Sequence, residues 1–193
     1  LIYKDVNNDG IINEMDDRPI GYRDNDVVPY LNYNFTINAE YKGFDLSMTF
    51  GGSAFASFYM DWEMRNPLHD GGNNPQYYMS DQWHLSNIND ANSALIPGKY
   101  PTLIEGNSSH SNYWRNDFWL KNVKYLKLRN LELGYTLPKK ITAPAYIQKL
   151  RIYTSMQNLF SIDNLGDIQM DPEISSGSGL QYPTSRVISI GCN

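Results

Sequence analysis

The chain has 193 residues, a formal net charge of -5 at pH 7, 15 tyrosines and a mean hydropathy of -0.52. No apolar run approaches the roughly 18 residues of a membrane-spanning helix, so any membrane role must be carried by strands. The acidic balance and the lack of a basic run exclude a nucleic-acid partner, and the single cysteine, Cys192, excludes an internal disulfide.

The N-terminal segment carries a motif for a hard metal ion. Residues 1–4 read as the end of a strand and lead directly into the run DVNNDGIINEMDD. Six residues of this run supply oxygen atoms at positions 1, 3, 5, 7, 9 and 12 of an EF-hand-like calcium loop over residues 5–16: Asp5, Asn7, Asp9, Ile11, Asn13 and Asp16. Gly10 at position 6 permits the sharp turn. We therefore expect one structural calcium ion.

Two features depart from a standard EF-hand. Position 12 holds Asp16, whose arm is shorter than that of the usual glutamate, and Pro19 and Gly21 argue against a helix after the loop. The alternative to a metal site is an Asx-rich turn, in which the side chains bond only their own backbone.

The stretch from Tyr30 to Phe55 alternates between apolar and polar residues. Apolar residues occupy every second position on both sides of the pair Lys42-Gly43: Leu31, Tyr33, Phe35, Ile37, Ala39 and Tyr41, then Phe44, Leu46, Met48 and Phe50. This pattern predicts a long β-hairpin with one apolar face. About twelve residues at roughly 3.3 Å each, tilted by about 45°, cover about 28 Å, close to the roughly 25 Å apolar band of an outer-membrane barrel. The hairpin alone leaves a membrane barrel and a soluble sandwich both open.

Residues 56–116 show no sustained period and are predicted to form one long loop. Three tryptophans in this loop are candidate contacts for a ligand or a partner: Trp62, Trp83 and Trp114. The alternative is that these rings pack the loop into a lid. The histidines His69, His84 and His110 lack the spacing of metal ligands and are treated as ordinary polar residues.

The run DFWLKNVKYLKLRNLELGYTLPKK holds the next strand. Its apolar residues change phase between Leu128 and Leu131, and a change of face within one strand needs one extra residue. We therefore expect a β-bulge around Arg129-Asn130, and we expect Pro138 to end the strand.

Two more strands complete the pattern. Residues 150–157 alternate as an amphipathic strand, and after a second irregular stretch the chain closes with SRVISIGCN. Ile188, Ile190 and Cys192 share one face of this last strand, so Cys192 is expected to be an apolar filler.

The connections between these strands alternate in length: the pair Lys42-Gly43, then about 60 residues, about 11 and about 24. An outer-membrane barrel has short periplasmic turns and long outer loops, whereas a soluble sandwich has no reason to separate its loops in this way. We therefore predict an all-β fold, an antiparallel transmembrane β-barrel segment with long outer loops. The calcium-like loop 5–16 and the extracellular loop 56–116 are expected on its outer rim.

Five motifs, taken in order, resemble one family. They are DVNNDGIINEMDDRPIG, NYNFTINAEYKGFDLSMTF, DFWLKNVKYLKLRNLELGYTLPKK, LRIYTSMQNLF and SRVISIGCN. Together they are similar to the C-terminal end of SusC/RagA-type TonB-linked outer-membrane proteins of the Bacteroidota, which are TonB-dependent transporters. The resemblance implies a plugged barrel of about 22 strands, of which residues 1–193 would form the last five or six.

The resemblance also implies a function. It is the import of a large nutrient, a glycan or a peptide, across the cell outer membrane, with a SusD-like surface lipoprotein as partner. The TonB complex would act through a region N-terminal to this chain, which itself would face the lipid bilayer as barrel wall. No catalytic constellation is present, so we expect no enzyme. The alternative function is a soluble calcium-dependent β-sandwich that binds carbohydrate through its tryptophans.

Overall fold

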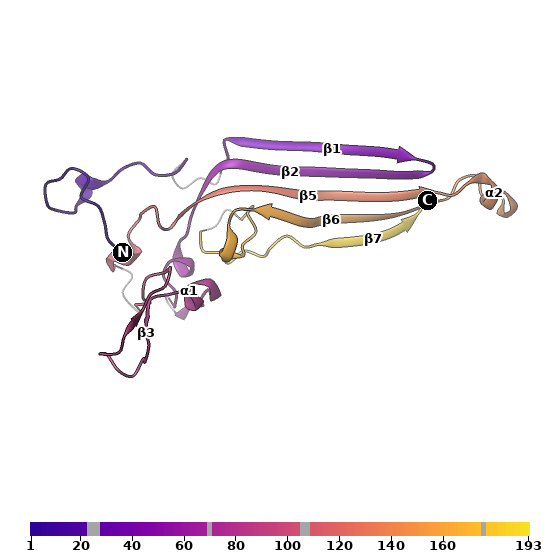
Figure 1. The fold of residues 1–193 in the computed structure, drawn as a ribbon. Helices are drawn as coiled ribbons and strands as arrows, with labels where there is room; N and C mark the ends of the chain where they lie inside the picture. The colour runs from indigo at the N-terminus through magenta and orange to yellow at the C-terminus, as the bar shows by residue number, and fades with distance from the viewer. Residues whose placement is uncertain (23–27, 69–70, 105–108, 175–176) are drawn as a thin grey trace.

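The computed structural model describes residues 1–22, 28–68, 71–104, 109–174 and 177–193. Five strands form one open antiparallel sheet in the order β1-β2-β5-β6-β7 (Figure 1). Their bounds are β1 Leu31–Tyr41, β2 Phe44–Tyr59, β5 Leu120–Thr136, β6 Arg151–Asp163 and β7 Val187–Cys192. The predicted all-β, antiparallel fold of a barrel segment is confirmed.

Short elements occupy the connections. Between β2 and β5 lie the helix α1 (Gln76–Ser80) and a two-stranded sheet of β3 (His84–Leu85) and β4 (Leu95–Ile96). The helix α2 (Lys139–Thr142) lies between β5 and β6. The 3-10 helices are η1 (Glu14–Asp16), η2 (Trp62–Met64), η4 (Ser111–Tyr113), η5 (Ala143–Ala145) and η6 (Gly166–Ile168). Within the described ranges, no helix has the length and apolarity needed to cross a bilayer.

The predicted hairpin is present as β1 and β2. Apolar residues of the two strands pair directly across the hairpin, as Ile37 does with Met48. Lys42 and Gly43 connect the strands with φ angles of 48° and 89°, and two residues with positive φ are what a tight type I′ turn requires. The turn sets the register that places the apolar residues of both strands on one face.

The second strand of the hairpin is longer than the sequence predicts. A bulge interrupts the pairing of β2 with β5 between Ser53 and Ala56, and Phe55 in that bulge has a φ of 58°. Because the bulge shifts the alternation, the strand continues to Tyr59 without a period-two pattern. The predicted loop 56–116 is therefore the connection 60–119 in the structure. Residues 1–4, expected as a strand end, form no strand.

The bulge predicted around Arg129-Asn130 is confirmed. Asn130 pairs with Thr49 of β2, but the next pair is Leu128 with Phe50, so Arg129 is the extra residue. The pairing of β5 with β6 shifts at the same place. The extra residue keeps the leucines before and after it on the same apolar face of the sheet.

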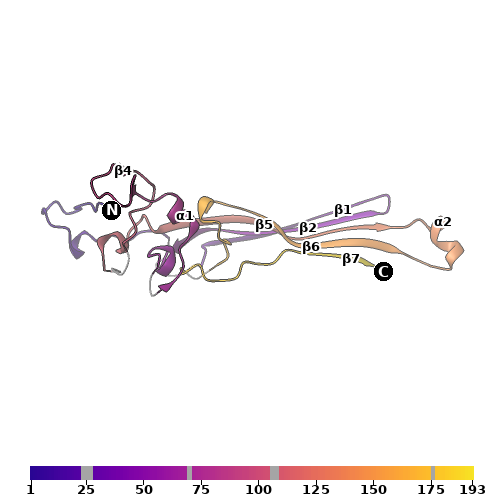
Figure 2. The ribbon, with the colours of Figure 1, turned by 90° about the horizontal axis from the view of Figure 1, so that it is seen from below.

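The strands form a single layer (Figure 2), and one face of this layer carries the apolar residues of the alternating pattern. Cross-strand pairs on this face join the inner strands, such as Leu131 with both Met48 and Met156. Among the described residues no second sheet packs on it, and several of its side chains are exposed, such as Ile37 at 44% and Ile190 at 81%. The uncovered face contradicts the sandwich alternative, because a sandwich buries this face against a second sheet.

The buried core lies beyond the apolar face, among the connections at one end of the sheet. It is built from Ala56, Phe58, Met60, Met64, Tyr78, Tyr100, Trp119, Val123, Leu165 and Ile168. The ring of Tyr78 stacks with that of Tyr100 at 5.2 Å and with that of Trp119 at 6.1 Å. Burial raises the pKa of the Tyr78 hydroxyl far above its usual value. The connection between β2 and β5 is thus a packed unit with its own core.

Candidate functional site at the loop end of the sheet

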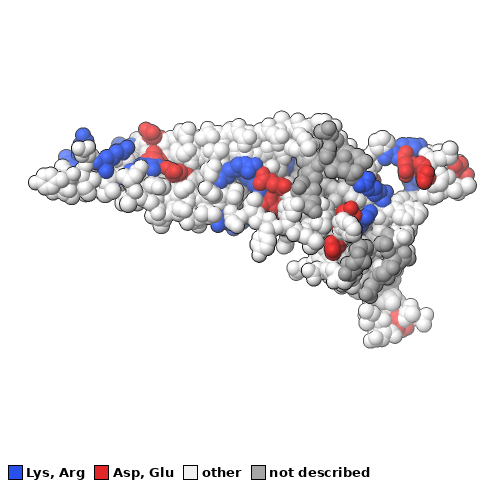
Figure 3. Space-filling model, turned by 180° about the vertical axis from the view of Figure 1, so that it is seen from behind, with Lys and Arg blue, Asp and Glu red and all other residues white. Residues whose placement is uncertain are grey.

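Ion pairs on the polar face join the strands of the sheet. The Arg151 guanidinium on β6 contacts the carboxylate of Asp45 on β2 and lies 2.6 Å from that of Glu132 on β5. Figure 3 shows basic and acidic side chains in adjacent patches along the length of the sheet. A charged, hydrogen-bonded face opposite an apolar one is typical of a strand that separates a watery lumen from lipid.

A second group of ion pairs ties the connection between β6 and β7 to the sheet. Lys127 on β5 donates hydrogen bonds to Asp171, at 2.5 Å, and to Glu173, at 2.8 Å. Arg129 donates to Glu173 over 2.5 Å, and the Thr184 hydroxyl donates to Asp171 over 2.5 Å. The Lys127 side chain is only 4% exposed. These contacts hold the connection over the polar face of β5.

The network favours the charged forms of both carboxyl groups. Burial alone would raise the pKa of Asp171, but hydrogen bonds from Lys127 and Thr184 outweigh it and lower this pKa to about 2. Burial opposes the ionisation of Glu173 in the same way, and hydrogen bonds from Lys127 and Arg129 lower its pKa below the usual value. Both carboxylates therefore stay ionised, and paired with a cation, at neutral pH.

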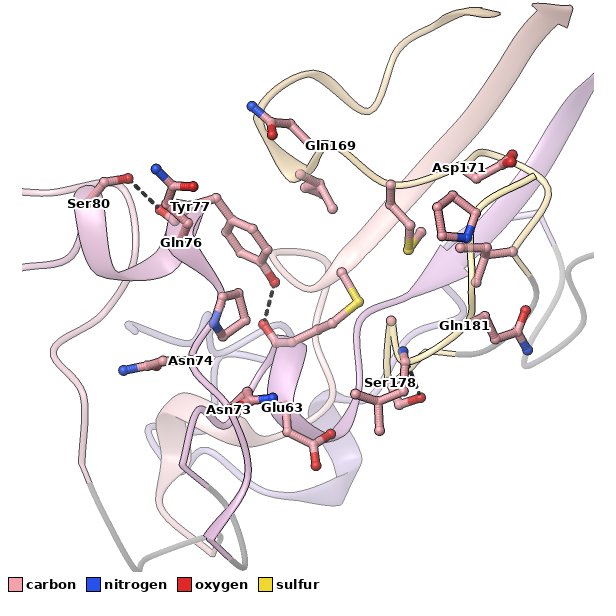
Figure 4. Close-up of a pocket in the computed structure, with 18 of the residues that line it drawn as sticks. Glu63, Asn73, Asn74, Gln76, Tyr77, Ser80, Gln169, Asp171, Ser178 and Gln181 are labelled. Atoms are coloured by element: carbon pink, nitrogen blue, oxygen red, sulfur yellow. Dashed lines mark hydrogen bonds between the residues drawn. The ribbon is translucent and has the colours of Figure 1, made fainter. Parts of the chain in front are cut away.

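A pocket of about 640 Å³ opens between the two long connections at this end of the sheet (Figure 4). Asp171 lines it and also binds Lys127, so one wall of the pocket is fixed to the polar face of β5. The lining mixes amide side chains with apolar ones: Asn73, Asn74, Gln76, Gln169 and Gln181 with Met64, Met170, Ile168, Ile174 and Leu180. Apolar walls with a few placed polar groups are typical of ligand sites.

The structure places the three candidate tryptophans outside this pocket. Trp62 and Trp83 are 55% and 39% exposed on the connection between β2 and β5. Trp114 packs against Tyr3 with ring centroids 5.5 Å apart, and its Nε1–H donates to the Ser109 carbonyl. Trp114 is itself 50% exposed, so all three tryptophans present surface to solvent, and Trp114 also contacts the N-terminal segment.

The two histidines among the described residues bond to separate backbone groups. His84 Nδ1 lies 2.9 Å from the Gln82 carbonyl oxygen, and His110 Nδ1 accepts from the Asn112 backbone N–H at 3.1 Å. His69 lies outside the described residues.

The predicted calcium loop is a closed turn held by its own side chains. Gly10 has a φ of 83°, and its backbone N–H donates to the Asp5 carboxylate at 2.8 Å. The Asp16 carboxylate accepts from the backbone N–H of Asn13 at 3.0 Å and of Val6 at 2.7 Å, and these bonds lower the pKa of Asp16. These side-chain-to-backbone hydrogen bonds are the ones expected for the Asx-rich turn, the alternative to a metal site.

The same loop has a donor set that suits a hard cation, because each carboxylate oxygen that accepts one N–H keeps a second lone pair. Asn7 Nδ2 donates to Asp9 Oδ2 at 2.9 Å, so two of the predicted ligands bond each other. Over the described part of the chain, no three His, Cys, Asp or Glu side chains are grouped as a metal site requires. Calcium at residues 5–16 therefore stays a prediction.

The N-terminal segment is attached to the loop end of the molecule. The Tyr3 hydroxyl donates to the Ser111 carbonyl at 2.6 Å and accepts from Asn116 Nδ2 at 2.8 Å. Figure 1 accordingly shows the loop 5–16 at the same end as the connection 60–119 and opposite the hairpin turn. Both segments predicted for one rim thus lie at one end of the sheet.

Aromatic rings mark both ends of the apolar face. Phe44 packs on Tyr135 with centroids 4.4 Å apart near the hairpin turn, and Phe55 packs on Tyr22 at 5.5 Å near the loop end. At about 3.3 Å per residue and a tilt of about 45°, β2 rises roughly 25 Å between Phe44 and Phe55. That height equals the apolar band of an outer-membrane barrel, whose borders carry aromatic girdles.

Comparisons with known proteins agree with this geometry. The chain is 25% identical over 206 residues to TonB-dependent receptor P3 of Formosa agariphila, an alignment that covers 100% of this chain and 18% of that protein. Over its whole length the chain is therefore similar to part of a TonB-dependent receptor, in agreement with the resemblance of its five motifs. No family model matches the chain.

Solved structures of the RagAB peptide importer share the fold of this chain. The structure in the "open-open" state has a TM-score of 0.54 and 22% identity, over 86% of this chain and 17% of that one. The structure in the "closed-closed" state has a TM-score of 0.56 and 23% identity, over 88% of this chain and 18% of that one. The chain therefore spans less than a fifth of the length of the proteins it matches.

Sequence reasoning missed the residues that build the inner side of the loop end. Lys127 and Arg129 alternate with leucines on β5, which was a signal for two basic side chains on the polar face. Their partners could not be paired from the sequence, because Lys127 and Asp171 are 44 residues apart and Asp171 lies in an irregular stretch.

Proposed function

We propose that this chain is a segment of a TonB-dependent receptor and forms barrel wall and outer loops of an active nutrient importer in the cell outer membrane. The observation that supports it most is the pair of opposite faces. One is an uncovered apolar face of membrane height, bordered by aromatic rings. The other is a polar face with ion pairs between strands. A wall of this kind separates lipid from a lumen through which cargo passes.

The loop end is the side from which cargo enters. The packed core of the connection 60–119 and the ion pairs of Lys127 position the pocket at the end of the polar face. Cargo captured there, a peptide or a glycan, lies next to the lumen. The energy for import comes from the TonB complex, which acts through a region N-terminal to this chain.

A SusD-like surface lipoprotein is the proposed partner at this end. The arm that carries β3 and β4 projects away from the sheet (Figure 1). It presents exposed apolar side chains, with Ile88 87% and Leu95 55% exposed, and Trp83 directly precedes β3. Replacement of Trp83 by alanine should weaken copurification of the lipoprotein, whereas replacement of Trp114, which packs on Tyr3, should instead loosen the N-terminal segment.

We also propose that the loop 5–16 binds one structural calcium ion through Asp5, Asn7, Asp9, the Ile11 carbonyl, Asn13 and Asp16. The support is the spacing of these residues, the positive φ of Gly10 and the hydrogen bonds that already curl the loop. The ion would stiffen a segment that Tyr3 attaches to the connection 60–119.

The full-length receptor, expressed with its lipoprotein in cells that lack both, provides the test. Uptake of a peptide digest or an oligosaccharide mixture should depend on the receptor and on an energised inner membrane, and an uncoupler should abolish it. The protein should require detergent for extraction. A full-length receptor that enters the aqueous phase without detergent would overturn the barrel, and uptake that persists after uncoupling would overturn TonB-driven import.

A further inference from the structure

The pocket between the two long connections has an uneven charge. Glu63, Asp81 and Asp171 are among the described residues that line it, and no Lys, Arg or His is. The charge of Asp171 is compensated by Lys127, which lies behind the pocket wall. An excess of negative charge remains, and it favours a cationic ligand.

One carboxylate oxygen of Glu63 is buried and accepts no hydrogen bond from the described residues. Among the described residues, no group donates a hydrogen bond to Glu63 Oε2, although this atom is closed to solvent. The Asn74 side-chain oxygen, which belongs to the same pocket lining, is also buried and has no hydrogen-bond partner in the described part of the chain. Buried acceptors without donors are costly, and in native structures they usually mark the place of a water, an ion or a ligand. Both atoms need a donor.

The other residues that line the pocket indicate the chemical class of the rest of the ligand. Met64, Met170 and Leu180 offer flexible apolar surface, and the side-chain amides of the lining can bond to peptide groups. Tyr77 is the aromatic residue among the described lining residues, and its ring is packed on Tyr100 at 5.3 Å. Sugars bind best on open aromatic faces, and this pocket does not offer one. The lining therefore suits a peptide better than a glycan.

We propose that this pocket is a cargo subsite that binds the primary ammonium group of an oligopeptide, either its N-terminus or a lysine side chain, with Glu63 as the anionic anchor. The ammonium donates to Glu63, and the adjacent peptide groups and side chains bind the amides and the apolar wall (Figure 4). The inference rests on the proposed import function and adds the chemistry that the importer selects.

The test is calorimetric binding to the full-length receptor in detergent. The probes are the tetrapeptide Gly-Lys-Met-Gly, the same peptide acetylated at both amino groups, and a fully deacetylated amino-sugar tetramer. The free peptide should bind about tenfold more tightly than the acetylated one, because a charge-assisted hydrogen bond is lost on acetylation. The amino sugar also carries primary ammonium groups, one on each sugar unit, but it has no apolar side chain, so it should bind more weakly than the free peptide.

Two variants test whether the preference for the free peptide arises in the pocket. Glu63→Gln keeps the side chain's size and removes its charge. This variant should bind the free and the acetylated peptide with about equal affinity. The control Asp90→Asn lies on the same connection outside the pocket, and its preference should match that of the unmodified receptor. Both variants should run as folded barrels in unheated gels.

Three results would overturn the subsite. They are equal binding of free and acetylated peptide, an unchanged preference in Glu63→Gln, and amino-sugar binding as tight as that of the free peptide. If these occur while cells still import cargo in an uncoupler-sensitive way, the subsite is wrong and the importer stands. If no cargo is imported at all, the proposed function fails.

Discussion

Lys127 on β5 and Asp171 in the connection between β6 and β7 form an ion pair of 2.5 Å in which the two side chains are only 4% and 8% exposed. Neither charge is well solvated, so each depends on the other for its stabilisation. The pair also links the polar face of the sheet to the pocket, because Asp171 belongs to both.

Lys127→Met should release the connection between β6 and β7 from the sheet. The substitution leaves a buried carboxylate without its counter-ion, which typically costs about 3 to 5 kcal/mol. Hydrogen exchange of residues 177–186 in the detergent-solubilised receptor should accelerate strongly. Lys124→Met, at an exposed position on the same strand, is the control and should leave this exchange unchanged. Equal exchange in both variants would contradict the role of the pair.

The attachment of this connection should weaken in strong acid. The folded-state pKa of Asp171 is about 2, below its usual value of 3.8, so ionised Asp171 stabilises the folded state above about pH 4. That contribution, about 2 kcal/mol, should disappear as the pH falls through about 2. Pepsin cleavage of the connection can be compared between the unmodified receptor and Asp171→Asn. The variant should be cleaved faster at pH 4.5, and the two should converge at pH 2.

Ile37→Arg and Asn38→Arg form a matched pair for the membrane facing of β1. The residues are adjacent, but Ile37 lies on the uncovered apolar face and pairs with Met48, whereas Asn38 pairs with Ser47 on the polar face. A charge at mid-membrane on the lipid side costs about 2 to 4 kcal/mol, and on the lumen side it costs little. The amount of folded barrel in outer-membrane fractions should decrease for Ile37→Arg and stay unchanged for Asn38→Arg. A similar loss of folded barrel in both variants would contradict the assignment of the two faces.

Asp9→Ala should abolish calcium binding by the loop 5–16. Asp9 stands at position 5 of the loop and accepts from the backbone N–H of Ile11 at 2.8 Å, so the substitution removes a ligand and a turn contact. Calorimetry with calcium chloride on the full-length receptor measures the binding. Asp17→Ala, just outside the loop, should bind calcium normally. Calcium binding that is equally strong in Asp9→Ala would leave the loop as an Asx-rich turn alone.

The sequence by itself determined the strands and the direction of their side chains. Alternation is a local property, since neighbouring residues of a strand point to opposite faces, and it therefore survives without any knowledge of partners. The hairpin at Lys42-Gly43 and the bulge at Arg129 could be predicted for this reason: each leaves its mark within a few residues of sequence.

Only the tertiary structure decided how the loop end is built. The extension of β2 to Tyr59 was hidden because the bulge at Phe55 breaks the alternation and the following residues enter a core instead of facing lipid. The ion pair of Lys127 with Asp171 and the pocket around Glu63 join segments far apart in the chain. Such contacts depend on how irregular connections fold back over the sheet, and no periodic pattern encodes that path.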